Sequence, residues 1–162
     1  MSDLLFKNAR VFDGTNADCA EGQWIRVADG RIQEMSAQPL VAPTARVIDV
    51  GGRTLMPGLI DAHVHAFASD VAVQKIDAMG EAYRAAHAVR MLTHALHCGF
   101  TTVRDVGGGN HSLWRALADG LFQGPRYLYS GKILSMTGGH GDMRQIEERP
   151  RYQAACGCDG GN

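Results

Sequence analysis

The chain lacks the features that mark membrane, nucleic-acid-binding and secreted proteins. No apolar run in its 162 residues approaches the roughly 20 that a membrane-spanning helix needs, so no membrane partner is expected. The net charge is −1 and no basic stripe is present, which disfavours nucleic acid as a partner. The first residues lack a basic segment followed by an apolar core, so no signal peptide is predicted.

Cysteine is scarce and is not spaced as a disulfide framework, which favours a reduced, cytoplasmic setting. Cys156 and Cys158 flank one glycine in a glycine-rich segment. With no second Cys or His pair nearby, a metal site at these two cysteines is the less favoured interpretation. The remaining composition, 45% hydrophobic and 20% charged, is ordinary for a soluble globular protein with a real core.

The first 55 residues predict a small β module. Short runs rich in β-branched residues are separated by turn signals, and Asp13-Gly14 closes the first of them. The clearest hairpin covers residues 24–35. Its turn is Asp29-Gly30, a pair suited to the two positive φ angles of a type I′ turn. Domain bounds of 1–55 and 56–162 are therefore expected.

From Leu55 onward, strand patterns alternate with helical ones. Apolar residues recur every three or four positions over 76–99, which predicts one long helix capped by Asp77. A shorter helix is expected over 112–120, with Asn110 or Ser112 as its cap, and the other predicted elements are strands within 60–65, 100–109 and 124–135. This order predicts an α/β fold with a parallel sheet and right-handed crossovers.

One of these strands carries ionisable residues in strict alternation with apolar ones. The apolar set is Ile60, Ala62 and Val64, and the polar set is Asp61, His63 and His65. Because side chains i and i+2 of a strand share a face, both imidazoles are expected on one side, at the carboxyl end of the strand. A solvated strand face would explain such a pair. The alternative is metal binding, since neutral imidazole is a common zinc ligand.

Three motifs resemble the amidohydrolase superfamily of metal-dependent hydrolases. They are "MPGLIDAHVH", "GFTTVRDVGG" and "SGKILSMTGGHGD", and the third is similar to the branch that holds imidazolonepropionase-like and prolidase-like enzymes. That branch includes zinc-dependent dipeptidases and carboxypeptidases. The resemblance implies an incomplete, sandwich-like β module over 1–55. Over 56–162 it implies the first three βα units of an incomplete (β/α)₈ TIM-like barrel.

The resemblance also implies a chemistry and a metal. His63 and His65 would bind Zn²⁺, one or two ions in the complete family site, and metal-activated water would hydrolyse a C–N bond. The implied substrates are dipeptides or N-acyl amino acids, with a cyclic amide as the alternative. A non-catalytic fragment or binding module is a rival of another class. A nucleotide-binding α/β domain is a second rival, but "GGGNHS" lacks the last glycine of the dinucleotide motif.

Four further residues are candidates near the site. Asp61 is interpreted as a group that supports the ligands without binding the ion, and Arg104 and Asp105 as a buried ion pair with a supporting role. His140, in the loop "TGGHGD", is a substrate-contact candidate, with an exposed loop histidine as the alternative. The helical histidines His87, His94 and His97 are interpreted as part of a solvated face.

Beyond these three motifs the chain departs from the family pattern. Only three of eight barrel strands are counted, and a barrel of this kind takes about 250 residues. The family's other metal groups and its general acid/base find no match, and Lys132 does not match the bridging lysine. We therefore expect an N-terminal part of an amidohydrolase, a fragment or an incomplete reading frame. It is expected to hold no catalytic residue, to be inactive alone and to be prone to homo-oligomerisation through unpaired strand edges.

Overall fold

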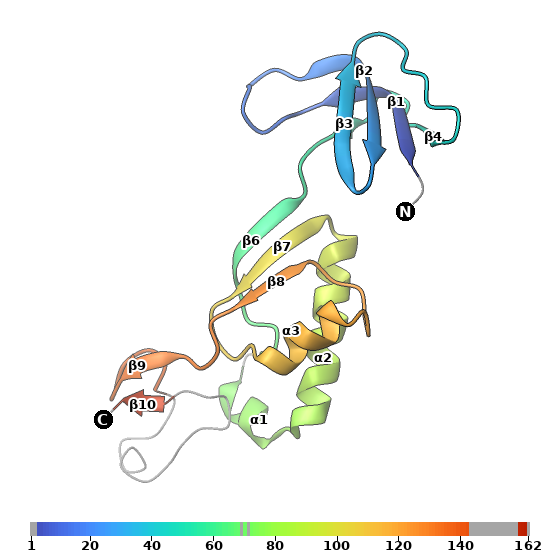
Figure 1. Ribbon diagram of the computed structural model, residues 1–162. Coiled ribbons are helices and arrows are strands. Elements are labelled where there is room, and N and C mark those ends of the chain that lie inside the picture. The colour runs from blue at the N-terminus through green and yellow to red at the C-terminus, as the bar shows by residue number, and fades with distance from the viewer. Residues whose placement is uncertain (1–2, 69, 71, 143–158, 162) are drawn as a thin grey trace. The chain divides into compact units, whose positions relative to one another are not determined.

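The computed structural model describes residues 3–68, 70, 72–142 and 159–161. The chain divides into two compact units, Met1–Pro57 and Gly58–Asn162 (Figure 1). The first unit consists of strands and the second combines strands with helices, so the fold is mixed α/β. No helix in the described part of the chain is long and apolar enough to cross a bilayer.

The first unit is a five-stranded sheet built around β1. Its strands are β1 (Leu4–Val11), β2 (Ala20–Ala28), β3 (Arg31–Ser36), β4 (Arg46–Asp49) and β5 (Thr54–Leu55). Their order is β3-β2-β1-β4, and β5 pairs with the end of β1. β1 is antiparallel to β2 but parallel to β4 and β5. β1, the first strand, is thereby joined to β4 and β5, the last two strands of the unit.

The predicted hairpin is confirmed. Ala28 pairs with Arg31, which leaves a two-residue turn between β2 and β3. Asp29 has φ 51° and Gly30 has φ 70°, the left-handed values that a type I′ turn requires of both central residues. Glycine adopts such a φ at little cost, and aspartate tolerates it better than most residues.

The second unit follows the predicted alternation of strands and helices. Its elements are β6 (Leu59–Val64), α1 (Val73–Ala78), α2 (Glu81–His97), β7 (Phe100–Asp105), α3 (His111–Ala118), β8 (Arg126–Tyr129), β9 (Leu134–Met136) and β10 (Asp159–Gly161). The first, second and third strands form a parallel sheet of order β6-β7-β8. The predicted parallel sheet is therefore confirmed, and the three strands end at a common edge.

The prediction of one helix over 76–99 is wrong at its start. α1 ends at Ala78, Met79 is extended with φ −80° and ψ 136°, and α2 begins only after Gly80. Asp77 lies within α1, so it is not the cap of the long helix. Glycine is among the weakest helix formers, and its presence inside an otherwise periodic pattern marks the break. Gly99 has φ 92° just after α2, as expected of a residue that terminates a helix.

The predicted third strand over 124–135 is in fact two strands. β8 pairs with β7, whereas β9 pairs with β10 in a separate two-stranded sheet. Between them Gly131 has φ 84°, a conformation in which a strand cannot continue. The backbone N–H of Gly108 donates to the Gly131 carbonyl at 2.9 Å, which holds this turn beside the loop after β7.

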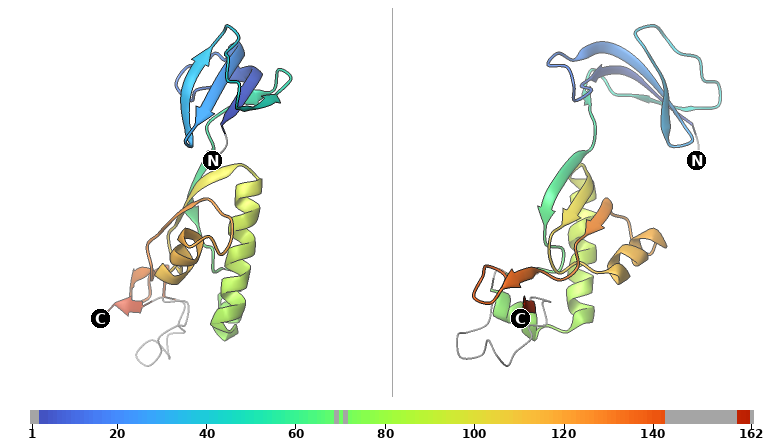
Figure 2. Two further views of the ribbon diagram at one scale, coloured as in Figure 1. Left: turned by 45° about the vertical axis from the view of Figure 1, so that its right-hand side comes forward. Right: turned by 60° about the vertical axis from the view of Figure 1, so that its left-hand side comes forward.

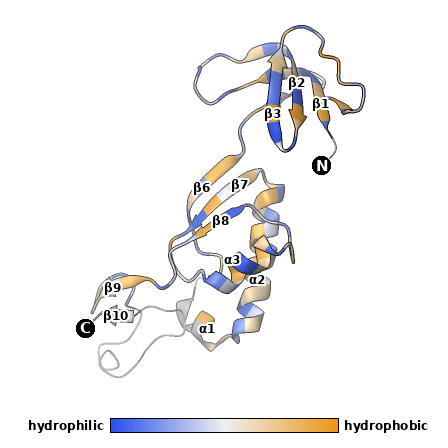
Figure 3. Cartoon of the chain, in the orientation of Figure 1, coloured by the Kyte–Doolittle hydropathy of each residue, from blue (hydrophilic) through white to orange (hydrophobic). Residues whose placement is uncertain are grey.

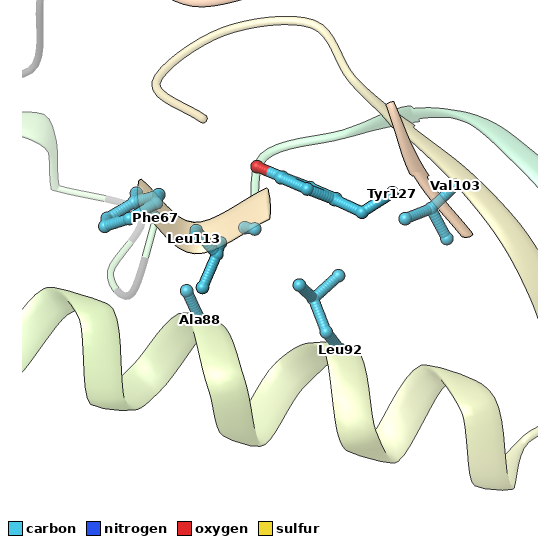
Figure 4. Packing of buried hydrophobic residues seen from close by; sticks show 7 residues of the cluster. Phe67, Ala88, Leu92, Val103, Leu113 and Tyr127 are labelled. Carbon is cyan, nitrogen blue, oxygen red and sulfur yellow. The ribbon is translucent and has the colours of Figure 1, made fainter. Parts of the chain in front are cut away.

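The core of the second unit lies between the helices and one face of the sheet (Figure 2). Its fully buried members are Ala66, Phe67, Ala88, Leu92, Val103, Leu113 and Tyr127, of which six are labelled in Figure 4. Hydrophilic and hydrophobic residues alternate along the strands (Figure 3). On β6 and β8, Ile60 and Leu128 are exposed. One face of this sheet is thus packed, while the other carries exposed apolar residues.

The cap of α3 allows a direct test of local stability. Asn110 Oδ1 accepts the backbone N–H of Leu113 at 2.9 Å, so Asn110 is the N-cap. We expect Asn110→Ala to destabilise the second unit by about 1 kcal/mol, the usual cost of losing such a cap. Urea unfolding measures the change. The control is Ser112→Ala, the rival cap; an equal loss there would contradict the assignment.

Candidate metal centre at the carboxyl ends of the strands

His63 and His65 lie at the carboxyl end of β6 with their rings on the same side. The ring centroids are 5.3 Å apart and the ring planes meet at 76°. His63 is exposed and His65 is half-buried. The predicted juxtaposition of the two rings is therefore confirmed. Because β6, β7 and β8 are parallel, the pair lies at the edge where the loops after these strands gather.

The ring of His65 is held by the loop after β7. Its Nδ1 lies 3.0 Å from the carbonyl oxygen of Gly107. Since a carbonyl oxygen only accepts hydrogen bonds, Nδ1 carries the hydrogen in this contact and Nε2 keeps its lone pair. A side chain at Gly107 would collide with Ile133, so glycine permits the Ile133 side chain to lie against the backbone of this loop. The geometry leaves Nε2 of His65 as the nitrogen able to bind an ion.

Asp61 contacts the backbone of its own strand, β6. Its Oδ1 accepts the N–H of His63 at 3.0 Å. The pairing of β6 with β7 is irregular here, because Asp61 pairs with Val103 and Val64 pairs with Asp105. β6 thus has one residue more than β7 over this stretch. Asp61 shapes the strand end from which His63 projects.

The expected ion pair between Arg104 and Asp105 is not formed. Neighbouring residues of a strand point to opposite faces, so the two side chains diverge from β7. Arg104 is exposed and its Nε donates to the Ala62 carbonyl at 2.8 Å. Asp105 is 0% exposed and bonds to neutral donors instead. Its partners are the N–H groups of Ala66 and Gly107, each at 3.0 Å, and the Tyr127 hydroxyl at 2.7 Å.

Tyr127 is a residue of the site that sequence reasoning did not single out. Burial, followed by the hydrogen bond to Asp105, raises the pKa of its hydroxyl far above the ordinary value, so it stays protonated and donates. The one available signal was that a buried tyrosine hydroxyl usually needs a partner. The sequence does not reveal which residue that partner is.

No described contact joins His140 or the helical histidines to His63 or His65. His140 is exposed in the turn that follows β9. His87, His94 and His97 line a shallow groove on α2, where His94 Nε2 lies 3.4 Å from Cys98 Sγ. Within the described ranges, no three His, Cys, Asp or Glu side chains are grouped to hold an ion. Cys156 and Cys158 lie outside the described residues.

A cavity of about 460 Å³ opens at the same edge of the sheet. It is lined by the loops after β6, β7 and β8, by the end of β8 and by the starts of α2 and α3, including Phe67, Arg84, His111, Tyr129 and Lys132. The guanidinium carbon of Arg84 lies 5.7 Å from the centre of the Phe67 ring. Loops at the carboxyl ends of parallel strands are the usual location of ligand sites in α/β proteins.

These features match those of one protein family. A sequence model described as "Amidohydrolase family" matches residues 54–157, which include β6, β7, β8 and both histidines. The chain belongs to the amidohydrolase family. The ochratoxinase of Aspergillus niger is 37% identical to this amidohydrolase over 92 residues, covering 55% of this chain and 19% of the ochratoxinase.

Two solved structures resemble the amidohydrolase chain over nearly its whole length. One is an amidohydrolase with 38% identity and a TM-score of 0.86, covering 96% of this chain and 37% of the other. The second is a prolidase complexed with N-methylphosphonate-L-proline, with 36% identity and a TM-score of 0.86. That alignment covers 97% of this chain and 38% of the prolidase. The chain thus spans less than two fifths of each of these relatives.

Proposed function

We propose that this chain contributes to a metal-dependent hydrolase of C–N bonds, with His63 and His65 as metal ligands. The observation that carries the proposal is the pair of imidazoles at the carboxyl end of β6, with ring centroids 5.3 Å apart. The Gly107 carbonyl accepts a hydrogen bond from Nδ1 of His65, which leaves the lone pair of Nε2 for an ion. Family membership supports the proposal, because amidohydrolases are metal-dependent enzymes.

The donor set fits zinc. Imidazole nitrogen is a normal zinc ligand, and catalytic sites typically use three protein ligands, of which this pair supplies two. A bound zinc ion would lower the pKa of a coordinated water and polarise the substrate carbonyl. The chain's own residues orient the ligands: Asp61 bonds to the backbone of His63, and Gly107 fixes the ring of His65.

The proposal extends to the architecture and the substrate. The sheet β6-β7-β8 with its crossover helices is proposed to be the first part of a (β/α)₈ barrel, with the ligands at its carboxyl end. Dipeptides or N-acyl amino acids are the proposed substrates. The similarity to a prolidase bound to a phosphonate of proline supports this class. His140, on an exposed turn, is proposed to contact the substrate.

A zinc titration of the 162-residue chain tests the ligand assignment. We expect zinc to bind weakly, because two protein ligands leave half of a tetrahedral shell to water. The double variant His63→Ala/His65→Ala should lower the affinity by about tenfold or more, since each ligand contributes directly to binding. Isothermal titration calorimetry measures both. The matched control is His87→Ala/His97→Ala on α2, which should bind like the unaltered chain.

The same samples test hydrolysis. A panel of dipeptides, N-acyl amino acids and a cyclic amide, assayed with added zinc, should show no turnover by this chain alone, for the same reason of ligand number. Turnover that disappears in the His63→Ala/His65→Ala variant would mean that the chain assembles a complete site. Zinc binding that is equal in the chain and in that double variant would overturn the proposed function.

A further inference from the structure

We propose that Asp105 is the positioning residue for His65, and that the hydroxyl of Tyr127 holds Asp105 in place. The inference rests on the proposed function, since it concerns how one of the two proposed ligands is oriented. The described hydrogen bonds of the Asp105 carboxylate go to Ala66, Gly107 and Tyr127 and to neither histidine ring. Asp105 acts through the backbone on both sides of His65, and Tyr127 acts through Asp105.

The carboxylate of Asp105 joins the segments that follow β6 and β7 to a side chain of β8. Its Oδ2 accepts the N–H of Ala66 and the hydroxyl of Tyr127, and its Oδ1 accepts the N–H of Gly107. Ala66 follows β6, Gly107 follows β7 and Tyr127 belongs to β8. One buried group thus sets the positions of all three segments at the carboxyl edge of the sheet.

His65 is fastened to this group at two points. The peptide bond that follows His65 carries the N–H of Ala66, and this N–H donates to Asp105 Oδ2. The ring of His65 bonds to the carbonyl of Gly107, whose N–H is bound by Asp105 Oδ1. The positions of the backbone and the ring of His65 therefore both depend on the same carboxylate. A shift of Asp105 would move the His65 ring relative to the Gly107 carbonyl. The hydrogen would then no longer be held on Nδ1, and Nε2 would no longer be kept free for an ion.

The chemistry of the site requires an acceptor-only group. All three partners are donors, and an ionised carboxylate accepts from each of them without opposing any. Burial of a charge is costly unless it is hydrogen-bonded, so the loss of one donor weakens the position of the group. Tyr127→Phe removes one donor and leaves the apolar packing in place. Asp105→Asn brings an NH₂ group against at least one donor.

The test compares Tyr127→Phe with a matched control, Tyr129→Phe, on the same strand. Tyr129 also presents a hydroxyl, but that hydroxyl faces His111 Nδ1 at 3.2 Å. The first readout is the ¹⁵N spectrum of the His65 ring in the metal-free chain. We expect the Nδ1–H tautomer in the unaltered chain and in Tyr129→Phe, and a mixture of tautomers in Tyr127→Phe.

The second readout is zinc affinity at a temperature where every variant is folded. Groups that orient a ligand change metal affinity by about 10–100-fold when they are altered, so Asp105→Asn should fall in this range and Tyr127→Phe near its lower limit. Tyr129→Phe should stay within about twofold. A residue that only supports folding would lower the melting temperature without changing the tautomer of the folded protein. If Asp105→Asn does not fold, Tyr127→Phe decides.

Two results would overturn the inference: a folded Tyr127→Phe variant with unchanged tautomer and affinity, or Nε2–H as the main tautomer of the unaltered chain. Failure of the proposed function is distinguishable from both. If the unaltered chain binds no zinc, the ligand assignment fails, yet the ring spectrum still reports whether Asp105 and Tyr127 set the orientation of His65.

Discussion

Leu92→Ala is expected to destabilise the second unit by about 2–5 kcal/mol, because a buried leucine loses its transfer free energy and leaves a cavity. Leu92 is 0% exposed and projects from α2 toward the sheet (Figure 4). It belongs to the same buried cluster as Val103 of β7 and Tyr127 of β8. Few other residues of this cluster can move to fill the space, since it is bounded by a sheet on one side and by helices on the other.

Urea unfolding followed by tryptophan fluorescence measures this loss. The chain has two tryptophans, Trp24 in the first unit and Trp114 in the second, so a Trp24→Phe background reports the second unit alone. The control is Leu121→Ala, where the side chain is 77% exposed and a change below about 0.5 kcal/mol is expected. A loss below about 1 kcal/mol for Leu92→Ala would show that the described core is not what stabilises this unit.

Gly109→Ala is expected to cost about 3 kcal/mol or more. A Cβ at this position would collide with the Tyr127 hydroxyl and would crowd the carboxylate of Asp105. Overpacking a tight site typically costs about 1–3 kcal/mol. Displacing the tyrosine also weakens a hydrogen bond to a charged group, which contributes about 1.5–3 kcal/mol. The added methyl group thus disrupts the hydrogen bond between Tyr127 and Asp105.

The matched control for this substitution is Gly80→Ala. Gly80 has φ −60°, and a Cβ there would meet nothing within 4 Å, so a change below about 1 kcal/mol is expected. The same fluorescence assay serves both variants. Equal stabilities of Gly109→Ala and Gly80→Ala would show that Tyr127 and Asp105 can give way without cost.

Local patterns were sufficient to predict the elements whose geometry depends on adjacent residues. The Asp29-Gly30 turn, the parallel β6-β7-β8 order and the pairing of the His63 and His65 rings all follow from turn chemistry or from strand periodicity. In each case the deciding interactions lie within a few residues, or follow from the alternation of strands and helices along the chain.

Features that depend on contacts between residues far apart in the sequence could not be predicted from local patterns. Arg104 and Asp105 were expected to form a buried ion pair where they close the second strand, yet the strand separates them onto two faces and each bonds to a different partner. The bond between Asp105 and Tyr127 joins residues 22 positions apart. The break at Gly80 was hidden because α1 and α2 together preserve the apolar period of one helix.

The pairing of β6 has a consequence for the order in which the chain is made. The first unit ends at Pro57 in the sequence, and its described strands pair with one another. β6 is synthesised next, but its partner β7 begins at Phe100, so residues 65–99 must be added first. At about 5–20 residues per second, this takes roughly two to seven seconds. For that interval the nascent chain carries β6, with its apolar residues Leu59 and Ile60, before the strand that pairs with it has been made.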